Sequence, residues 1–312
     1  MKLKIHVLAA AAGATLLASA AHANFAFADA TSKGNSSAVF VAMDNAQNIS
    51  VAVDLNAFMV DFLPATSGIN PTAGSLSAAG TTAVWNFASN SFTVNGAAVA
   101  GTVNWASPVA SFLTNAAVTG NGYQWGVVAG DSANGAISAN NLVTGQNLLF
   151  TGNPVDFNNL VAAGGTSTGQ IANATTNISN FVAVNNNTGT NSTTVHGAST
   201  ATSGAPFLGT TLANGGIGDF SGGSFGNNNF LVDPTAVSYF TWANNTLPPT
   251  LYSLGGSTTV GALSDSAATW SWDGATQTLT YAVPAVPEPG TTAMLLAGLA
   301  SLAFLGRRRA SR

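Results

Sequence analysis

The sequence contains no cysteine, and charged residues make up only 6% of its 312 residues. Without cysteine there is no disulfide framework, so a folded domain must rely on its hydrophobic core. Only three histidines are present, whereas zinc sites usually take three or four Cys or His ligands. We therefore predict neither a metal site nor a bound cofactor.

Positive charge is scarcer still away from the two ends of the chain. Six of the seven Lys and Arg residues lie within the first four or the last six positions. Residues 24–286 contain ten aspartates, no glutamate and a single cation, Lys33, which gives a formal side-chain charge of −9. Phosphate backbones are bound by clustered Lys and Arg, so nucleic acid is excluded as a partner. Binding to an anionic membrane surface is disfavoured for the same reason.

The apolar content is high, at 46%, and 9% of the residues are aromatic. Disordered chains combine low hydrophobicity with high net charge, so this composition favours a folded domain. A segment of about 260 residues is long enough to bury a core without covalent staples. We expect a surface made polar by Gly, Ala, Ser, Thr and Asn rather than by Lys and Glu.

The first residues have the pattern of a secretory signal peptide. Two lysines in the first four positions precede an apolar run over residues 7–20. Ala21 and Ala23 then fit the small-x-small cleavage rule, which predicts a mature chain that starts at Asn24. The sequence thus predicts a signal peptide over residues 1–23, with signal peptidase and the secretion machinery as partners.

The last 27 residues combine three features. Val286, Pro287, Glu288 and Pro289 come first, an uncharged apolar run follows over residues 291–305, and Arg307, Arg308 and Arg309 end it. The run can span a bilayer if it extends back to Pro289. Arginines favour the cytoplasmic side, so the bulk of the chain would lie outside the membrane. The two prolines favour an extended, accessible segment before the helix.

This arrangement of motif, helix and basic cap resembles the PEP-CTERM tail that an exosortase handles in Gram-negative bacteria that secrete exopolysaccharide. The resemblance implies an exported protein, anchored in the inner membrane by its tail, cut near the motif and released to the cell surface or extracellular matrix. Short phrases elsewhere, such as residues 125–131 and 200–204, also resemble uncharacterised PEP-CTERM proteins of this length. That likeness implies a role with exopolysaccharide in biofilm or floc formation, and no established activity.

Residues 24–285 read as one mostly-β domain between the signal peptide and the 286–312 tail. Alternating apolar residues predict hairpins over 39–53, 84–94 and 269–283, and further strands over 123–129 and 237–242. Helical spacing favours short helices over 55–63, from Ser107-Pro108 onward, and over about 168–184. We expect a β-sandwich of antiparallel sheets with two or three short helices. Residues 185–206 are low in complexity and predict an exposed loop.

Catalytic chemistry has few candidates. His196 is the one histidine beyond the signal peptide, it falls in the predicted loop, and no Gly-x-Ser-x-Gly elbow accompanies it. We expect it to be solvated. Asp44, Asp54 and Asp61 are close in sequence, but Asp44 and Asp273 have turn character. We predict no catalytic residue, while a secreted hydrolase with an Asp pair stays open as an alternative.

Two weaker binding patterns remain. Asp131 with Asn134, or Asp219, could offer oxygens to calcium, but no EF-hand or nonapeptide repeat supports such a site. Six tryptophans could stack on sugar rings, although buried aromatics are the commoner use: Trp85, Trp105, Trp125, Trp242, Trp270 and Trp272.

The sequence as a whole favours a non-enzymatic, exported surface or matrix protein associated with exopolysaccharide. A carbohydrate-binding adhesin module is the first alternative, and the secreted hydrolase is the second. A row of exposed tryptophans on a sheet face would favour the adhesin, and two aspartates about 5–10 Å apart in a cleft would favour the hydrolase.

Overall fold

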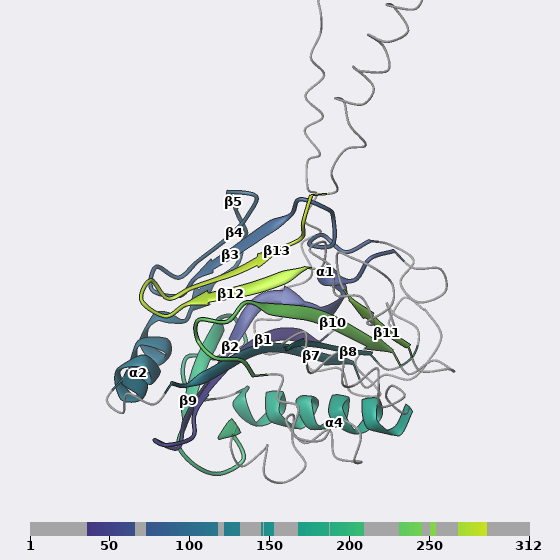
Figure 1. Cartoon of the computed structure of the whole chain (residues 1–312). Coiled ribbons are helices and arrows are strands. Elements are labelled where there is room, and N and C mark those ends of the chain that lie inside the picture. Colours follow the sequence, from purple (N-terminus) through teal and green to yellow (C-terminus); the bar gives the residue numbers. More distant parts are fainter. Residues whose placement is uncertain are drawn as a thin grey trace, which may run out of the picture.

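The computed structural model describes residues 36–65, 73–117, 122–131, 145, 147–152, 168–186, 188–208, 231–244, 250–253 and 268–285. In this part of the chain, thirteen strands form one continuous sheet, ordered β5-β4-β3-β13-β12-β10-β8-β7-β1-β2-β9-β6, with β11 paired to β10. Figure 1 shows this sheet curled into two layers, with α4 beneath the lower layer and α2 at one edge.

The lower layer is built on the hairpin of β1 (Ser37–Asp44) and β2 (Ile49–Phe58). The Asp44 carboxylate accepts the backbone N–H groups of Ala46 and Gln47 at 2.8 and 3.1 Å, and so closes the turn. Asn48 ends this turn at a φ of +48°, a conformation that asparagine tolerates. The predicted hairpin is confirmed, and β2 is longer than its alternating residues indicated.

The other lower-layer strands extend this hairpin on both sides. They are β7 (Gln124–Asp131), β8 (Asn147–Gly152), β9 (His196–Ala201), β10 (Ser238–Asn244), β11 (Thr250–Ser253) and the two-residue β6 (Val103–Asn104). β1 and β8 are buried at every position because each face of the layer is covered. α4 (Thr168–Asn185) packs on β7 and β8, and α2 (Ala106–Ala117) packs on β2 and β9.

The upper layer is made of β3 (Thr82–Asn86), β4 (Ser91–Val94), β5 (Ala97–Ala98), β12 (Thr269–Asp273) and β13 (Thr278–Ala282). In β12 and β13 the side chains alternate between a buried and a more exposed face. Trp85, Trp270 and Leu279 point inward and are fully buried, whereas their neighbours point to solvent. The hairpins predicted over 84–94 and 269–283 are confirmed.

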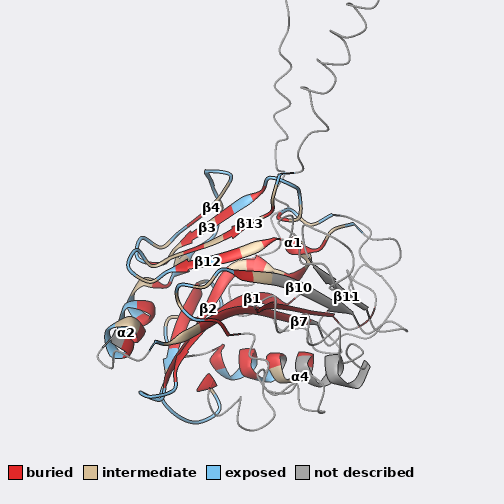
Figure 2. Cartoon of the chain, viewed as in Figure 1, coloured by how far each residue is buried: buried red, intermediate tan, exposed pale blue. Residues whose placement is uncertain are grey.

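The main core lies between the two layers and is rich in aromatic rings. Phe40 of β1 packs against Trp272 of β12 with ring centroids 4.9 Å apart, and Trp85 stacks on Phe92 at 4.6 Å. A second cluster lies between the lower layer and α4, where Ile178 and Phe181 meet β1 and β8 side chains. Figure 2 shows the buried residues concentrated in these two seams.

The predicted mainly β class is confirmed. The predicted sandwich of separate sheets is not, because the described strands form one sheet. β10 pairs with β8 through six residues and with β12 through Ser238 and Tyr239. This strand carries the hydrogen-bonded ladder from the lower layer into the upper one. The result is a single curled sheet whose inner faces pack against each other as the halves of a sandwich do.

Several local predictions need correction. The helix predicted over 55–63 is reduced to α1 (Met59–Phe62), because residues 55–58 continue β2. α2 begins at Ala106 rather than after a Ser107 cap, since the Asn90 side chain accepts the N–H groups of Trp105 and Ala106 at 2.6 and 3.1 Å. The strand predicted over 123–129 continues to Asp131 in β7, although the Gly130-Asp131 sequence favours a turn.

The largest correction concerns residues 185–206, which were predicted to be an exposed loop. They contain β9, whose first four residues are buried, and a turn that packs against it. The helix predicted over 168–184 is confirmed as α4.

The signal peptide and the apolar tail lie outside the described residues. Two further segments also lie outside them: residues 215–229, whose Gly and Asn content predicts a loop, and the residues from Asn153, where an Asn-Pro pair predicts the start of a helix. Among the helices that are described, none has both the length and the apolar character needed to cross a membrane.

Candidate functional site

The strongest polar cluster in the described residues is centred on Asp54 and His196, which are 142 positions apart in sequence. His196 Nδ1 lies 3.0 Å from Asp54 Oδ2, the Asp54 side chain is 0% exposed and that of His196 is 9% exposed. Asp54 comes from β2 and His196 from the start of β9, so pairing of the two strands brings them together. The prediction of a solvated His196 is therefore wrong.

A bulge in β2 shapes the cluster. The β1–β2 register shifts between Ser37 and Val39, and Asn56 adopts a φ of +51° opposite this irregularity. The Asp54 Oδ1 atom accepts the Asn56 N–H at 3.0 Å, so both carboxylate oxygens have a partner. The carboxylate is therefore stabilised at a site that water does not reach.

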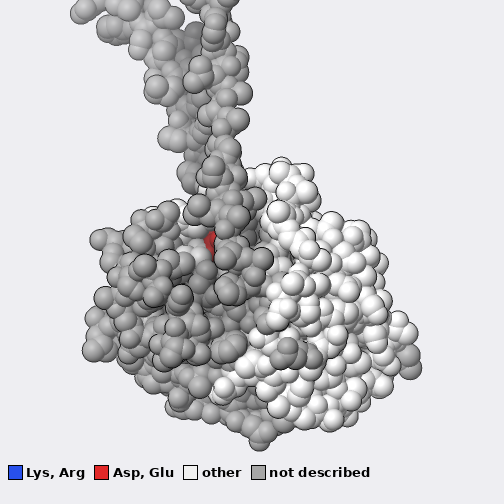
Figure 3. Space-filling model, turned by 180° about the vertical axis from the view of Figure 1, so that it is seen from behind, with Lys and Arg blue, Asp and Glu red and all other residues white. Residues whose placement is uncertain are grey.

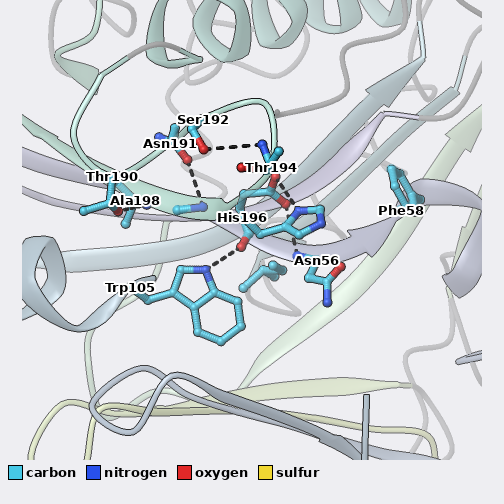
Figure 4. Close-up of polar contacts among 12 residues, drawn as sticks. Asn56, Phe58, Trp105, Thr190, Asn191, Ser192, Thr194, His196 and Ala198 are labelled. Carbon is cyan, nitrogen blue, oxygen red and sulfur yellow. Dashed lines mark hydrogen bonds and ion pairs between the residues drawn. The ribbon is translucent and has the colours of Figure 1, made fainter. Parts of the chain in front are cut away.

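Two indoles bind the backbone of the same bulge. Trp105 Nε1 donates to the Asp54 carbonyl at 2.8 Å, and Trp85 Nε1 donates to the Leu55 carbonyl at 2.6 Å. Figure 4 shows Trp105 and Asn56 close to His196, both below its ring in this view. Carbonyls that the bulge removes from the ladder thus find buried donors.

The backbone around His196 is held by β6 and by the turn that follows α4. The His196 N–H donates to the Thr102 carbonyl at 2.9 Å, in the parallel pairing of β6 with β9. Asn191 Oδ1 accepts the Gly197 N–H at 3.1 Å, and Thr190 Oγ1 donates to the Asn104 carbonyl at 2.5 Å. Figure 4 shows this turn over the imidazole.

A catalytic triad needs a hydroxyl or thiol on the imidazole nitrogen that faces away from the carboxylate. Among the described residues, no hydrogen bond joins the His196 imidazole to a serine or threonine hydroxyl. With the imidazole nearly closed to solvent, the geometry suits a structural link between β2 and β9. The sequence signal that could have located the pair was weak: an aspartate at the end of an apolar strand, and a histidine that follows Val195 in a segment of otherwise small polar residues.

Asp61 and Asp273 are each held by hydrogen bonds within their own local structure. Asp61 Oδ2 accepts the Phe58 N–H at 2.8 Å, and the Ser75 hydroxyl donates to its Oδ1 at 3.2 Å. Burial raises the pKa of Asp61 above its ordinary value, although both of these hydrogen bonds act in the opposite direction.

Asp273 closes the β12–β13 turn, as predicted, with its Oδ1 accepting the Ala275 N–H at 2.9 Å. Hydrogen bonds from Thr276, first from its side chain and then from its backbone, lower the pKa of the exposed Asp273 carboxyl.

The structure places five of the six candidate tryptophans in the core. Trp85, Trp105, Trp125 and Trp270 are fully buried and Trp272 nearly so, whereas the Trp242 side chain lies outside the described set. The two buried indoles of β12 confirm the core interpretation of that strand. A platform of exposed tryptophans for sugar stacking is therefore not available from these five.

No group of three or more His, Cys, Asp or Glu residues in the described ranges is arranged to hold a metal ion. Asn134, Asp219 and the Asp131 side chain lie outside those ranges.

The predicted processing residues also lie outside the described part of the chain. These are Ala21, Ala23 and Asn24 at the signal cleavage site, Val286, Pro287, Glu288 and Pro289 in the motif, and Arg307, Arg308 and Arg309 in the basic cap. The structure does place the attachment point of the tail. Val283 is buried, Ala285 is exposed, and the motif starts at the next residue.

Comparison with known families identifies that tail. A family model for the PEP-CTERM protein-sorting motif matches residues 285–309. No curated protein and no solved structure matches the chain. The match takes in the Pro-Glu-Pro segment, the apolar run and all three arginines of the cap. The chain is thus a PEP-CTERM domain-containing protein, and its motif indicates export and sorting by an exosortase.

Proposed function

We propose that this protein is a non-enzymatic component of the cell surface or extracellular matrix of a Gram-negative bacterium. Its tail holds it in the inner membrane until exosortase cuts near Pro287-Glu288-Pro289, and the β domain then associates with exopolysaccharide. The observation that carries the proposal is the sorting motif over 285–309, joined directly to the end of a folded β domain.

The polar inventory supports a role without catalysis. The one ion pair in the described residues is the buried link between Asp54 and His196. Asp44, Asp61 and Asp273 each accept hydrogen bonds from backbone N–H groups within three positions of themselves, as structural aspartates in turns and caps do. General acid–base catalysis would need such groups accessible and facing a substrate.

The described surface supports contact with neutral polymers. Among residues whose exposure is described, Asp233 and Asp273 are the only exposed charged ones, and Lys and Arg are absent from the described ranges. Figure 3 shows one side of the molecule, on which the described surface carries almost no charge. Hydroxyl and amide groups offer hydrogen-bond donors and acceptors to sugar hydroxyls, and they carry no charge that would favour an ionic polymer over a neutral one.

The outer face of the upper layer is the most regular part of this surface. Thr93, Val84, Thr280 and Ser271 are in register across four consecutive strands, so Thr280 and Ser271 are direct neighbours and Val84 separates Thr280 from Thr93. Strands in a sheet are spaced about 4.8 Å apart, so these three hydroxyl residues form a row that Val84 interrupts once. Single neutral hydrogen bonds contribute only about 1 kcal/mol, so a long polymer that makes many of them suits this face better than a small sugar.

The proposal is tested by the intact mass and terminal sequences of the protein isolated from its native cell envelope and medium. We expect a chain that starts at Asn24 and ends near Pro287-Glu288-Pro289, recovered with the exopolysaccharide fraction. A full-length C-terminus that remains in the membrane fraction would overturn processing and leave a tail-anchored surface domain.

The carbohydrate-binding adhesin is a second candidate, and the hydroxyl row of the upper layer favours it. Thr280→Lys would place a long charged side chain in the middle of this row without touching the core. We expect this variant to lose co-sedimentation with the native neutral polysaccharide, while Thr114→Lys, on the exposed face of α2, keeps it. Equal binding by both variants would exclude this face as the contact surface.

A further inference from the structure

The strand nearest the sorting motif, β13, lies in the interior of the sheet. It forms five residue pairs with β12 on one side and five with β3 on the other. Among the described strands, β3, β4 and β5 join the rest of the sheet only through β13. In Figure 1 this strand runs between β3 and β12 in the upper layer.

Side chains of β13 also complete the core between the layers. Leu279 and Tyr281 are fully buried, and Val283 just after the strand is nearly so. The Tyr281 ring lies 4.9 Å from Trp270 of the neighbouring strand and 5.2 Å from Phe62 of α1. Without β13, apolar surface from β3, β12 and α1 would face water.

The chain leaves the domain through a hydrogen-bonded seam. The Val283 N–H donates to the Thr81 carbonyl at 2.8 Å, and the Gly80 N–H donates to the Val283 carbonyl at 2.9 Å. Ala285 is exposed two residues later, and the motif matched by the family model begins at that residue. The folded domain and the sorting signal therefore adjoin each other with no intervening linker.

We propose that β13 is the closing strand of the domain, so that β3, β4 and β5 join the rest of the sheet only when the segment next to the sorting motif becomes available. The slot between β3 and β12 is a strand-binding site, and its occupant is residues 278–283 of the same chain. The partner of β3 lies far along the chain. Asn86 of β3 pairs with Thr278 of β13, and the two residues are 192 positions apart in sequence.

The consequence for sorting rests on the proposed function. A chain exported from its N-terminus delivers β13 almost last, immediately before the tail. The domain then closes at about the time the tail reaches the membrane, and exosortase acts on a folded domain held a few residues from its cutting site. Among the described residues Val283 is the last buried one, so we expect the cut to leave the described core intact.

The first test compares two substitutions in β13 of the full-length chain in detergent. Leu279→Asp places a charge in the seam between the layers, whereas Thr280→Asp places the same charge on the outer face. We expect at least a tenfold rise in the rate of proteolysis and a red shift of tryptophan emission for Leu279→Asp, with less than a twofold change for Thr280→Asp. Equal behaviour of the two variants would overturn the proposal.

The second test distinguishes a closing strand from a core that any buried charge would destabilise. A protease recognition sequence replaces residues 274–277, the exposed turn before β13, and the folded full-length protein is cut there. We expect the fragment from residue 278 onward to stay bound. After separation in denaturant, the larger fragment should remain protease-sensitive alone and regain resistance when the smaller one is added.

Refolding of the larger fragment by itself to a protease-resistant form would refute the closing-strand role. Export and exosortase cleavage have no part in this experiment. An uncut C-terminus on the native protein would therefore overturn the proposed sorting and leave the closing strand standing.

Discussion

At the scale of single residues, the scarcity of charge concentrates electrostatic effects on very few side chains. In the described residues, His196 is the only histidine and Lys and Arg are absent, and its imidazole lies 3.0 Å from the Asp54 carboxyl group where water is excluded. Breaking a buried pair is costly because one partner stays charged and unsolvated. The lone histidine thus contributes to the attachment of β9 to β2.

His196→Ala should lower the free energy of unfolding by about 3 kcal/mol, because the buried Asp54 carboxylate loses its imidazole partner. Urea denaturation at neutral pH measures this loss. Thr194→Ala, at an exposed position in the adjacent turn, is the control and should change stability by less than about 0.5 kcal/mol. A loss for His196→Ala as small as that of the control would show that the pair is not a stabilising link.

Asp61 should give a measurable pH dependence. Its folded-state pKa is raised from 3.8 mainly by burial, so the folded protein disfavours the charged form. The stability that Asp61 contributes is therefore full below its unfolded-state pKa and is lost as the pH rises through the raised pKa. Asp61→Asn stays uncharged, keeps an acceptor for the Phe58 N–H, and should lack this loss.

Urea midpoints of the wild-type protein and Asp61→Asn, measured from pH 3 to pH 7, test this expectation. The wild-type protein should lose stability relative to the variant as the pH rises. A difference between the two that stays constant over this range would show that the Asp61 pKa is not raised in the folded state.

At the scale of elements, sequence patterns located the hairpins and failed where the polar residues are buried. The alternation of Trp270, Trp272 and Leu279 predicted β12 and β13 because one face of each is apolar. β9 has the sequence HGASTA, with no large apolar residue, so its composition indicated a loop. Its burial comes from tertiary contacts with β2, β6 and α2.

The backbone of the turn after α4 lies very close to the backbone of β9. Gly189, in the turn after α4, has a φ of +64°, and a Cβ there would collide with the Ala198 carbonyl. Gly96 has a φ of +80°, but a Cβ there would meet only open space. The two positions share the backbone strain and differ in packing.

Gly96→Ala should therefore cost about 1 kcal/mol, the strain of a left-handed residue. Gly189→Ala should cost about 3 kcal/mol, because overpacking adds to the same strain. Chemical denaturation of both variants gives the comparison. Equal costs would mean that the turn at Gly189 moves freely away from β9.

At the scale of the whole molecule, one curled sheet carries a sorting signal at its exit. The last core residue, Val283, and the Pro287-Glu288-Pro289 motif are separated by only a few positions. This proximity leaves the motif just outside the folded domain.

Glu288→Ala removes the only charge of the motif. We expect the variant protein to keep its apolar tail and to accumulate uncut in the membrane fraction of the native host. Asp273→Asn, an exposed acid in the β12–β13 turn, is the matched control and should be processed normally. Mass spectrometry of the C-terminal peptide distinguishes the two forms, and a normally cut Glu288→Ala protein would exclude the glutamate from recognition.

The sequence by itself determined the mainly β class, three hairpins, the α4 helix, the weakly charged surface and the sorting tail. These follow from local patterns: side chains that alternate with period two, helical spacing, and motifs read within a few residues. Only the tertiary structure decided that β10 joins both layers, that β13 pairs with β3, and that His196 is buried against Asp54. These contacts join residues far apart in the chain, and their energy depends on which surfaces meet when the sheet curls.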